Sequence, residues 1–405
     1  MIPHRSMLGV LLVAALTPVL ALPSTPAQAP PLRTPAPSAA TPVSAKQARA
    51  RTSAAKVYDT SVLHRIDITM SDSDARSIVK RTKTRVRARF VFDGVTLDDV
   101  GIRQAGGVYF PYVSIGQKPS LSIKFDEFVS TRTLFGLDKI VLKNERQDYS
   151  LVNEHLTYEV FRRAGLAASL TAHARVTLNG IDDGIYLMRE PVDGAFLMRN
   201  FGENDGDLYE IENKREFVTD PGYPSLRNDG RNGRNRNNLL RLAAAVRSTG
   251  PKTFVADLAP LVDIDRLITH VAAEMATGHW DGLTFRNNNT YLYVRESDGR
   301  FIFIPYGADQ AFGGPSADPS PSQEPPMSML VKRLVAAPGL LQRVQTEASR
   351  MRREPVWNQR ALLQRLKQVG EILAGAGTTG RTGSDVERFL RNRGTMVALI
   401  RSGGG

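Results

Sequence analysis

Two carboxylates and one carboxamide lie close together in the middle of the sequence: Asp281, Asn289 and Asp309. Oxygen ligands of this kind suit Mg²⁺, which binds one or two carboxylates and completes its shell with water and substrate phosphates. A remaining aspartate can accept the proton of a hydroxyl group. The trio therefore predicts a magnesium site with a general base beside it. The alternative interpretation is turn chemistry, because Asp and Asn often satisfy backbone donors in loops.

The expected local structure brings the three side chains to one place. Apolar residues at helical spacing predict a helix that ends at Gly278. Further on, Asp298-Gly299 separates two alternating runs and predicts a hairpin with a two-residue loop. In that register Asn289 lies opposite Ala308 and therefore beside Asp309. The order of these parts, followed by a Phe-Gly pair, is the order found in a protein-kinase active site.

Composition limits the classes of protein and partner. The chain has 405 residues, which is enough for two or three domains, and it has no cysteine, so disulfides, thiolate zinc sites and a cysteine nucleophile are excluded. A net charge of +12 favours anionic partners such as a nucleotide or an acidic protein. The densest basic tract, residues 227–241, is rich in Arg, Asn and Gly without interleaved aromatic residues, so a solvated loop is expected there and no nucleic-acid partner.

The first residues have the pattern of a secretory signal peptide. Residues 1–29 combine a weakly basic start, an apolar run and a small-x-small cleavage site at Ala27-Gln28-Ala29. Residues 30–55 are rich in Pro, Ala, Thr and Ser and are expected to form a disordered linker. We therefore expect a secreted, periplasmic or cell-envelope protein with no transmembrane segment in the mature chain. An uncleaved membrane anchor is the alternative for the apolar run.

The remaining sequence predicts a sheet-rich first part and a helical second part. A long helix is expected over residues 151–165, ended by Gly165. From residue 239 onward the pattern is mostly helical apart from the central hairpin. The strands expected before that point cover residues 62–68, 86–92, 95–102, 120–125, 139–143, 175–178 and 185–188.

A series of motifs then follows in a specific order: KPS with SIKF, LFGLDKIVLKN, NEHLTYEVFRRAG, NGIDDGIYLMREPVD, FLMRNFGENDGDLYEI, GHWDG, NNNTYLY and FIFIPYGADQAFGG. In this order they resemble the CotH family of bacterial spore-coat kinase-like proteins, from about Lys56 to the C-terminal helices. The resemblance implies an α+β, two-lobed protein-kinase-like fold. It predicts an N-lobe over residues 56–190, a mainly antiparallel sheet with one long helix, and a mostly helical C-lobe over residues 191–401.

The resemblance also assigns roles around the trio. Asp281 resembles the catalytic-loop aspartate, while Asn289 and Asp309 resemble the two metal ligands. The implied cofactors are ATP and Mg²⁺. Catalysis of phosphoryl transfer is mainly positioning and charge neutralisation, so these groups and a lysine would supply most of it.

Four further residues are implied in nucleotide binding. Lys124 resembles the strand lysine that holds nucleotide phosphates, with Lys143 as a rival, and Glu154 resembles its partner on the helix. Glu190 lies where the two lobes would join and could support an adenine pocket. The alternatives are structural: Lys124 could face solvent, Glu154 could be a first-turn helix acid, and Glu190 could end a strand.

Three functions remain open from the sequence. The first is an exported protein kinase that uses ATP and Mg²⁺ to phosphorylate Ser or Thr of a secreted or cell-envelope protein. The second is adenylylation or glutamylation by the same nucleotide site. The third is a non-catalytic scaffold, a pseudokinase of the envelope or coat, which two departures from the family favour: Gly307 stands where the family often has an acid, and Arg103-Gln104-Ala105-Gly106-Gly107 replaces an Arg-Gly-Asn-Ser-type loop.

Overall fold

A computed structural model describes residues 43–79, 84–106, 113–114, 116–148, 150–211, 215–229, 236–312, 328–377 and 379–402. The chain divides into residues 1–40 and residues 41–405, and all that follows concerns the second unit. The predicted signal peptide lies outside the described residues, as do Gly107 and Gly313. The first described element is α1 (Ala45–Val57), a helix within the segment whose composition predicted a linker. Ser44 begins it by accepting the Gln47 N–H at 3.1 Å.

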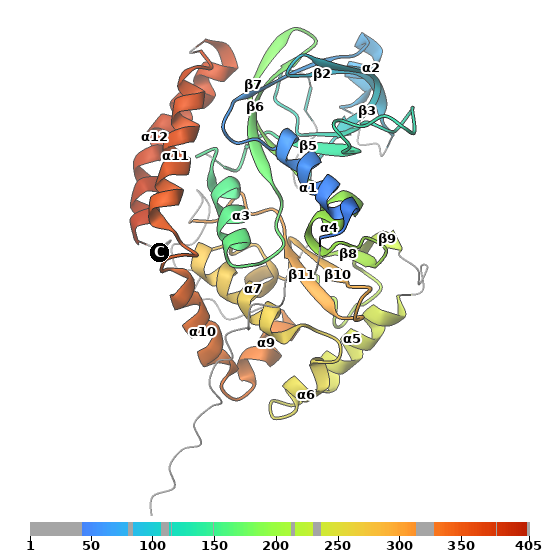
Figure 1. The fold of residues 1–405 in the computed structure, drawn as a ribbon, viewed down its shortest axis with the longest axis vertical. Coiled ribbons are helices and arrows are strands. Elements are labelled where there is room, and N and C mark those ends of the chain that lie inside the picture. The colour runs from blue at the N-terminus through green and yellow to red at the C-terminus, as the bar shows by residue number, and fades with distance from the viewer. Residues whose placement is uncertain are drawn as a thin grey trace, which may run out of the picture. The chain divides into compact units, whose positions relative to one another are not determined.

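Seven strands close into a barrel in the order β1-β2-β3-β4-β5-β7-β6 (Figure 1). The closing pair is parallel: β1 (His64–Thr69) runs beside β6 (Thr171–Leu178), with His64 opposite Ala174. The expected two-lobed, kinase-like layout with an antiparallel N-lobe sheet is therefore wrong. The other barrel strands are β2 (Val86–Phe92), β3 (Val95–Gln104), β4 (Leu121–Lys124), β5 (Lys139–Lys143) and β7 (Ile181–Arg189).

The strands expected at residues 86–92 and 95–102 form a hairpin within the barrel. Asp93 and Gly94 both have positive φ, 48° and 86°, and join Phe92 to Val95 as a two-residue loop. This is the backbone that a twisted hairpin requires and that Asp-Gly adopts readily. Local turn chemistry thus accounts for this antiparallel pair, but it carried no information about the parallel pair between two distant segments. The barrel interior is filled by large apolar side chains that are almost fully buried, among them Phe90, Phe92, Phe125 and Tyr186.

Two sets of helices pack against the barrel. The predicted long helix is α3 (Asn153–Arg163), and its residues 153–161 are all buried. The C-terminal helix α12 (Gly380–Ser402) lies along β7, beside α11 (Gln359–Ala374) (Figure 1). Asp385 of α12 accepts hydrogen bonds from the backbone N–H of Ile185 at 2.8 Å and from Lys118 Nζ at 2.6 Å. The last helix is therefore anchored directly to the barrel.

A separate four-stranded antiparallel sheet has the order β11-β10-β8-β9. Its strands are β8 (Asp207–Ile211), β9 (Ser225–Asp229), β10 (Thr290–Val294) and β11 (Phe301–Pro305). The predicted two-residue loop between β10 and β11 is wrong, because Thr290 pairs with Pro305 and the Tyr306 N–H donates to Asn289 O at 3.0 Å. Asn289 thus lies opposite Tyr306 and not Ala308. A shift of two residues keeps every side chain on its expected face, since side chains alternate with a period of two.

Most of the remaining helices lie on the side of this sheet, whereas α2 (Asp72–Ser77) packs against β2 of the barrel. The central one, α7 (Ile264–Thr277), ends at Gly278, which has a φ of 62° as predicted for a C-terminal glycine. No helix in the described ranges is long and apolar enough to cross a membrane. The others are α4 (Gly194–Phe201), α5 (Asn237–Ser248), α6 (Phe254–Leu258), α8 (Leu283–Arg286), α9 (Met329–Ala336) and α10 (Leu340–Met351).

Candidate functional site

An ion pair joins the barrel to the end of the central hairpin. Lys143, the last residue of β5, places its Nζ 3.1 Å from Oδ2 of Asp309, which follows β11. Both side chains are largely buried, with 22% and 13% of their surface exposed. Burial by itself lowers the pKa of Lys143, but the carboxylates of Asp309 and Glu154 outweigh it and raise this pKa. Lys143 therefore remains a cation beside two carboxylates.

Glu154 lies behind this pair in the first turn of α3 and is fully buried. Its Oε1 accepts hydrogen bonds from the Tyr158 hydroxyl at 2.7 Å and from Arg189 Nη1 at 3.1 Å. Its Oε2 has no hydrogen-bond partner among the described residues. Burial raises the pKa of Glu154, but the charges of Lys143 and Arg189 offset this and lower it overall. The helix acid is therefore held as a carboxylate between two cations.

Asp281 and Asn289 form the second half of the site. Asn289 Nδ2 donates to Asp281 Oδ2 at 3.0 Å and lies 3.4 Å from the carbonyl oxygen of Gly307, two residues before Asp309. Because the amide nitrogen makes both contacts, the amide oxygen is the atom of Asn289 that could ligate a cation. Asn153 Nδ2 contacts the backbone oxygen of Asp309 at 3.4 Å. The structure thus brings the predicted trio to one end of the hairpin.

Gly307 lies so close to the side chain of Asn289 that a larger residue does not fit at this position. Its φ is 54°, and a Cβ built there would lie 2.8 Å from Cγ of Asn289. Real Cβ atoms do not approach so closely, so any side chain at this position must displace the asparagine. An acid at position 307, which the resemblance led us to expect, is therefore incompatible with Asn289 as it stands in this chain.

Glu274 of α7 fixes the loop that carries Asp281, a contribution that the sequence reasoning missed. Its buried carboxylate accepts the backbone N–H groups of Leu283 at 2.9 Å and Thr284 at 2.8 Å. A Cβ at Gly282 would lie 2.1 Å from Glu274 Oε1, so only glycine lets the loop approach. An acid inside an otherwise apolar helical run was the sequence signal that could have revealed it.

Two further acidic side chains near the ion pair, Asp148 and Glu145, were also not identified from the sequence. Burial raises the pKa of Asp148 to about 6, and burial followed by the charge of Asp148 raises that of Glu145 well above its ordinary value. Asp148 accepts the N–H groups of Ser150 at 2.9 Å and Asn153 at 2.7 Å, which fixes the entry to α3. The surroundings of the ion pair are thus rich in acid, which favours a cation there.

The described residues contain no ready cluster of three His, Asp or Glu side chains that would hold a metal on its own. The donors that fit Mg²⁺ are one carboxylate, Asp309, and the amide oxygen of Asn289. A site with so few protein ligands matches the preference of Mg²⁺ for one or two carboxylates together with water and substrate phosphates.

Lys124, the first choice of lysine from the sequence, lies away from this constellation. It pairs with Asp126 at 3.3 Å and Glu127 at 3.2 Å, and its side chain is 37% exposed. In the barrel it is opposite Lys139, four residues before Lys143 on β5, or about 13 Å away along the strand. Of the two lysines, Lys143 is the one that reaches Asp309.

Glu190 holds the structure together beside the barrel. Its carboxylate accepts Arg199 Nε at 2.8 Å and the backbone N–H of Leu170 at 3.0 Å. These contacts tie α4 to the segment before β6 and occupy both carboxylate oxygens. The structure therefore does not bring Glu190 together with Lys143 and Asp309.

Comparisons with known proteins agree with the motifs. Residues 106–366 match the family described as CotH kinase protein. The chain is 24% identical over 200 residues to the inner spore coat protein H of Bacillus subtilis (strain 168), which covers 46% of this chain and 53% of that protein. It thus spans about half the length of this curated relative. The match to the family covers more than half of the sequence and includes Lys143, Glu154, Asp281, Asn289 and Asp309. The chain belongs to the CotH kinase protein family.

Proposed function

We propose that this protein is an exported transferase that uses ATP and Mg²⁺ to phosphorylate Ser or Thr hydroxyls of a secreted or cell-envelope protein. The observation that carries the proposal is the ion pair of Lys143 and Asp309, 3.1 Å long, beside the buried carboxylate of Glu154. Family membership supports a kinase-like activity in general. Export rests on the signal-peptide pattern of residues 1–29.

Each group has a separate task in this proposal. Lys143 neutralises charge on the ATP phosphates, and Glu154 together with Asp309 keeps it protonated and in place. Asp309 and the amide oxygen of Asn289 would hold Mg²⁺. The bound ion would neutralise the charge that develops on the phosphate oxygens. Arg189 fixes Glu154 through an ion pair of 3.1 Å.

Asp281 is the base in this proposal. The substrate hydroxyl oxygen forms a bond to the γ-phosphorus of ATP, the bond from that phosphorus to the β,γ-bridging oxygen breaks, and ADP leaves with the electron pair. The hydroxyl proton passes to the Asp281 carboxylate, which Asn289 orients through its 3.0 Å hydrogen bond. Glu274 contributes by holding the loop against α7.

A second candidate, a non-catalytic scaffold, is favoured by one observation. Gly307 leaves the site one acid short, and the close approach of Asn289 leaves no room for that acid. In this case the fold would be kept and the basic surface, with a net charge of +12, would bind acidic partners.

Titration of Mg-ATP into the wild type and the Asp309→Ala variant tests the nucleotide site. We expect saturable binding in the wild type and at least about tenfold weaker binding in the variant, because a charged ligand of the metal is lost. Asp126→Ala, which removes an acid beside Lys124, is the matched control and should bind as the wild type does. Equal affinity in all three proteins contradicts the metal role of Asp309, and absence of binding to the wild type favours the scaffold.

ATP labelled at the α or the γ phosphate distinguishes phosphorylation from adenylylation. Label transferred to protein from the γ phosphate alone supports the kinase. Transfer from the α phosphate alone rules out simple kinase activity and supports adenylylation or a subsequent glutamylation.

A further inference from the structure

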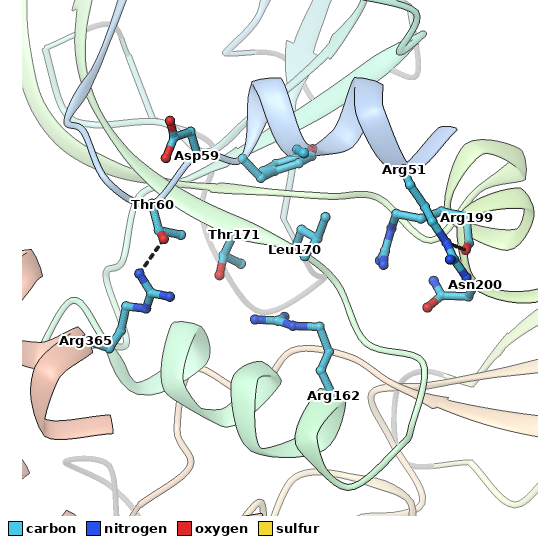
Figure 2. Close-up of a pocket in the computed structure, with 11 residues that line it drawn as sticks. Arg51, Asp59, Thr60, Arg162, Leu170, Thr171, Arg199, Asn200 and Arg365 are labelled. Carbon is cyan, nitrogen blue, oxygen red and sulfur yellow. Dashed lines mark hydrogen bonds between the residues drawn. The ribbon is translucent and has the colours of Figure 1, made fainter. Parts of the chain in front are cut away.

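A pocket of about 630 Å³ lies at the opposite end of α3 from Glu154. Arg162 is eight positions after Glu154 on this helix, which is about 12 Å along the axis. Figure 2 shows the side chains of four arginines around this pocket, each from a different helix: α1, α3, α4 and α11. Its lining residues are Arg51, Ala55, Tyr58, Asp59, Thr60, Arg162, Leu170, Thr171, Arg199, Asn200 and Arg365. We call it the arginine pocket.

Two of these arginines lack a carboxylate partner. Arg162 makes no ion pair with any acid of the described residues, and its Nη1 donates to the backbone oxygen of Ser169. Burial lowers the pKa of Arg162 to about 10, and although Glu159 counteracts this, the charge of Arg199 adds to it. Arg51 is exposed, and within the described part of the chain its guanidinium group hydrogen-bonds only to the backbone oxygen of Arg199, at 3.5 Å. Both guanidinium groups therefore keep donors for an anion.

The other two arginines are fixed in position by single acids. Arg199 Nε donates to Glu190 at 2.8 Å, and Arg365 Nε donates to Glu159 at 3.3 Å. These ion pairs fix the guanidinium groups in position before a ligand binds, which lowers the conformational entropy lost on binding.

Charge around the pocket is unbalanced. Four guanidinium groups face three carboxylates: Asp59 in the lining, and Glu159 and Glu190 behind it. Glu159 is shared further with Arg163, at 2.8 Å. The arginine pocket therefore retains a net positive charge, and an anion would relieve the repulsion between its arginines.

We propose that the arginine pocket binds a phosphate monoester. Planar guanidinium groups from several directions match the three terminal oxygens of such a group, and Arg is the residue most suited to bidentate contact with phosphate. The volume is that of a site for a small molecule or a single modified side chain. The phosphate could belong to a free metabolite or to a phosphorylated residue of a protein. This site is separate from the proposed nucleotide site and goes beyond the transferase function.

Binding of three probes to the full chain without ATP or Mg²⁺ tests the proposal: inorganic phosphate, a short synthetic peptide with one phosphoserine, and the same peptide unphosphorylated. We expect at least one phosphorylated probe to bind and the unphosphorylated peptide not to. Arg162→Gln and Arg51→Gln should each weaken that binding about tenfold or more, because each removes charge-assisted hydrogen bonds. The second variant alters an exposed side chain on α1, so the test does not depend on whether a buried substitution folds.

Two controls make the result specific. Arg391→Gln removes the same charge from an exposed position on α12, where the side chain is 68% exposed, and should leave binding unchanged. Asp309→Ala should also bind the probes normally, which separates this site from the nucleotide site. If the phosphopeptide binds more tightly than inorganic phosphate, the ligand is a phosphorylated residue of a protein. If inorganic phosphate binds as tightly as the phosphopeptide, the ligand is a free phosphate compound. Failure of both phosphorylated probes to bind, or binding that survives both pocket substitutions, overturns the proposal.

Discussion

Replacing Lys143 by methionine removes one charge while keeping a side chain of similar length. In the structure Lys143 lies 3.1 Å from Asp309 and beside Glu154, whereas Lys124 is paired elsewhere on the barrel. We therefore expect Lys143→Met to bind Mg-ATP more weakly and Lys124→Met to bind it as the wild type does. The pair of variants is matched, since both lysines end a barrel strand and both form an ion pair with an aspartate.

The expected losses of Mg-ATP affinity and of folding stability can be estimated from the contacts of Lys143. A hydrogen bond from a cation to a phosphate contributes about 1.5–3 kcal/mol, so binding should weaken about 10- to 150-fold. Loss of Lys143 also leaves two carboxylates near each other. Breaking a fully buried pair costs about 3–5 kcal/mol of folding free energy. Because Lys143 is 22% exposed, solvent screens part of this, and about 1–3 kcal/mol is expected.

The assay is calorimetric titration of Mg-ATP, with denaturant unfolding of each variant to confirm that the protein is folded under the titration conditions. Lys124→Met should bind within about twofold of the wild type, since exposed ion pairs contribute little. The reasoning is refuted if Lys143→Met, shown to be folded, binds Mg-ATP as tightly as the wild type. It is also refuted if Lys124→Met is the weaker binder of the two.

Two further predictions concern Gly307 and Asp148. Gly307→Ala should lower the free energy of unfolding by about 1–2 kcal/mol through its positive φ and should also weaken Mg-ATP binding, because the new Cβ displaces Asn289. Gly299→Ala, at φ 70° with open space around its Cβ, is the control that should lose stability but keep binding, and equal binding by both variants contradicts the steric argument. The pKa of Asp148 is raised to about 6 in the folded protein from its ordinary 3.8. Above that pKa the charged carboxylate destabilises the folded protein, so the free energy of unfolding rises as the pH falls through about 6. Relative to Asp148→Asn, the wild type should therefore gain about 2 kcal/mol in unfolding free energy between about pH 7.5 and pH 4.5. Urea unfolding at both values measures this, and a difference that does not change with pH contradicts a buried, destabilised carboxylate.

Local chemistry in the sequence determined several features of this protein. The Asp93-Gly94 turn and the helix of residues 153–163 follow from patterns spanning a few residues, and the trio of Asp281, Asn289 and Asp309 was identified within one continuous stretch of sequence. Turn glycines and apolar periodicity act over short distances, so they are visible without a fold. The ordered motifs identified the family for the same reason, since each is a continuous segment.

Only the tertiary structure decided how these segments meet. Closure of the barrel through β1 and β6 joins strands that no local pattern pairs, and this overturned the two-lobed layout. Lys124 and Lys143 both end short strands, so their sequences alone could not show which lysine faces Asp309. The arginine pocket was equally invisible, because its four cations come from four helices spread from residue 51 to residue 365 and become neighbours only when those helices pack.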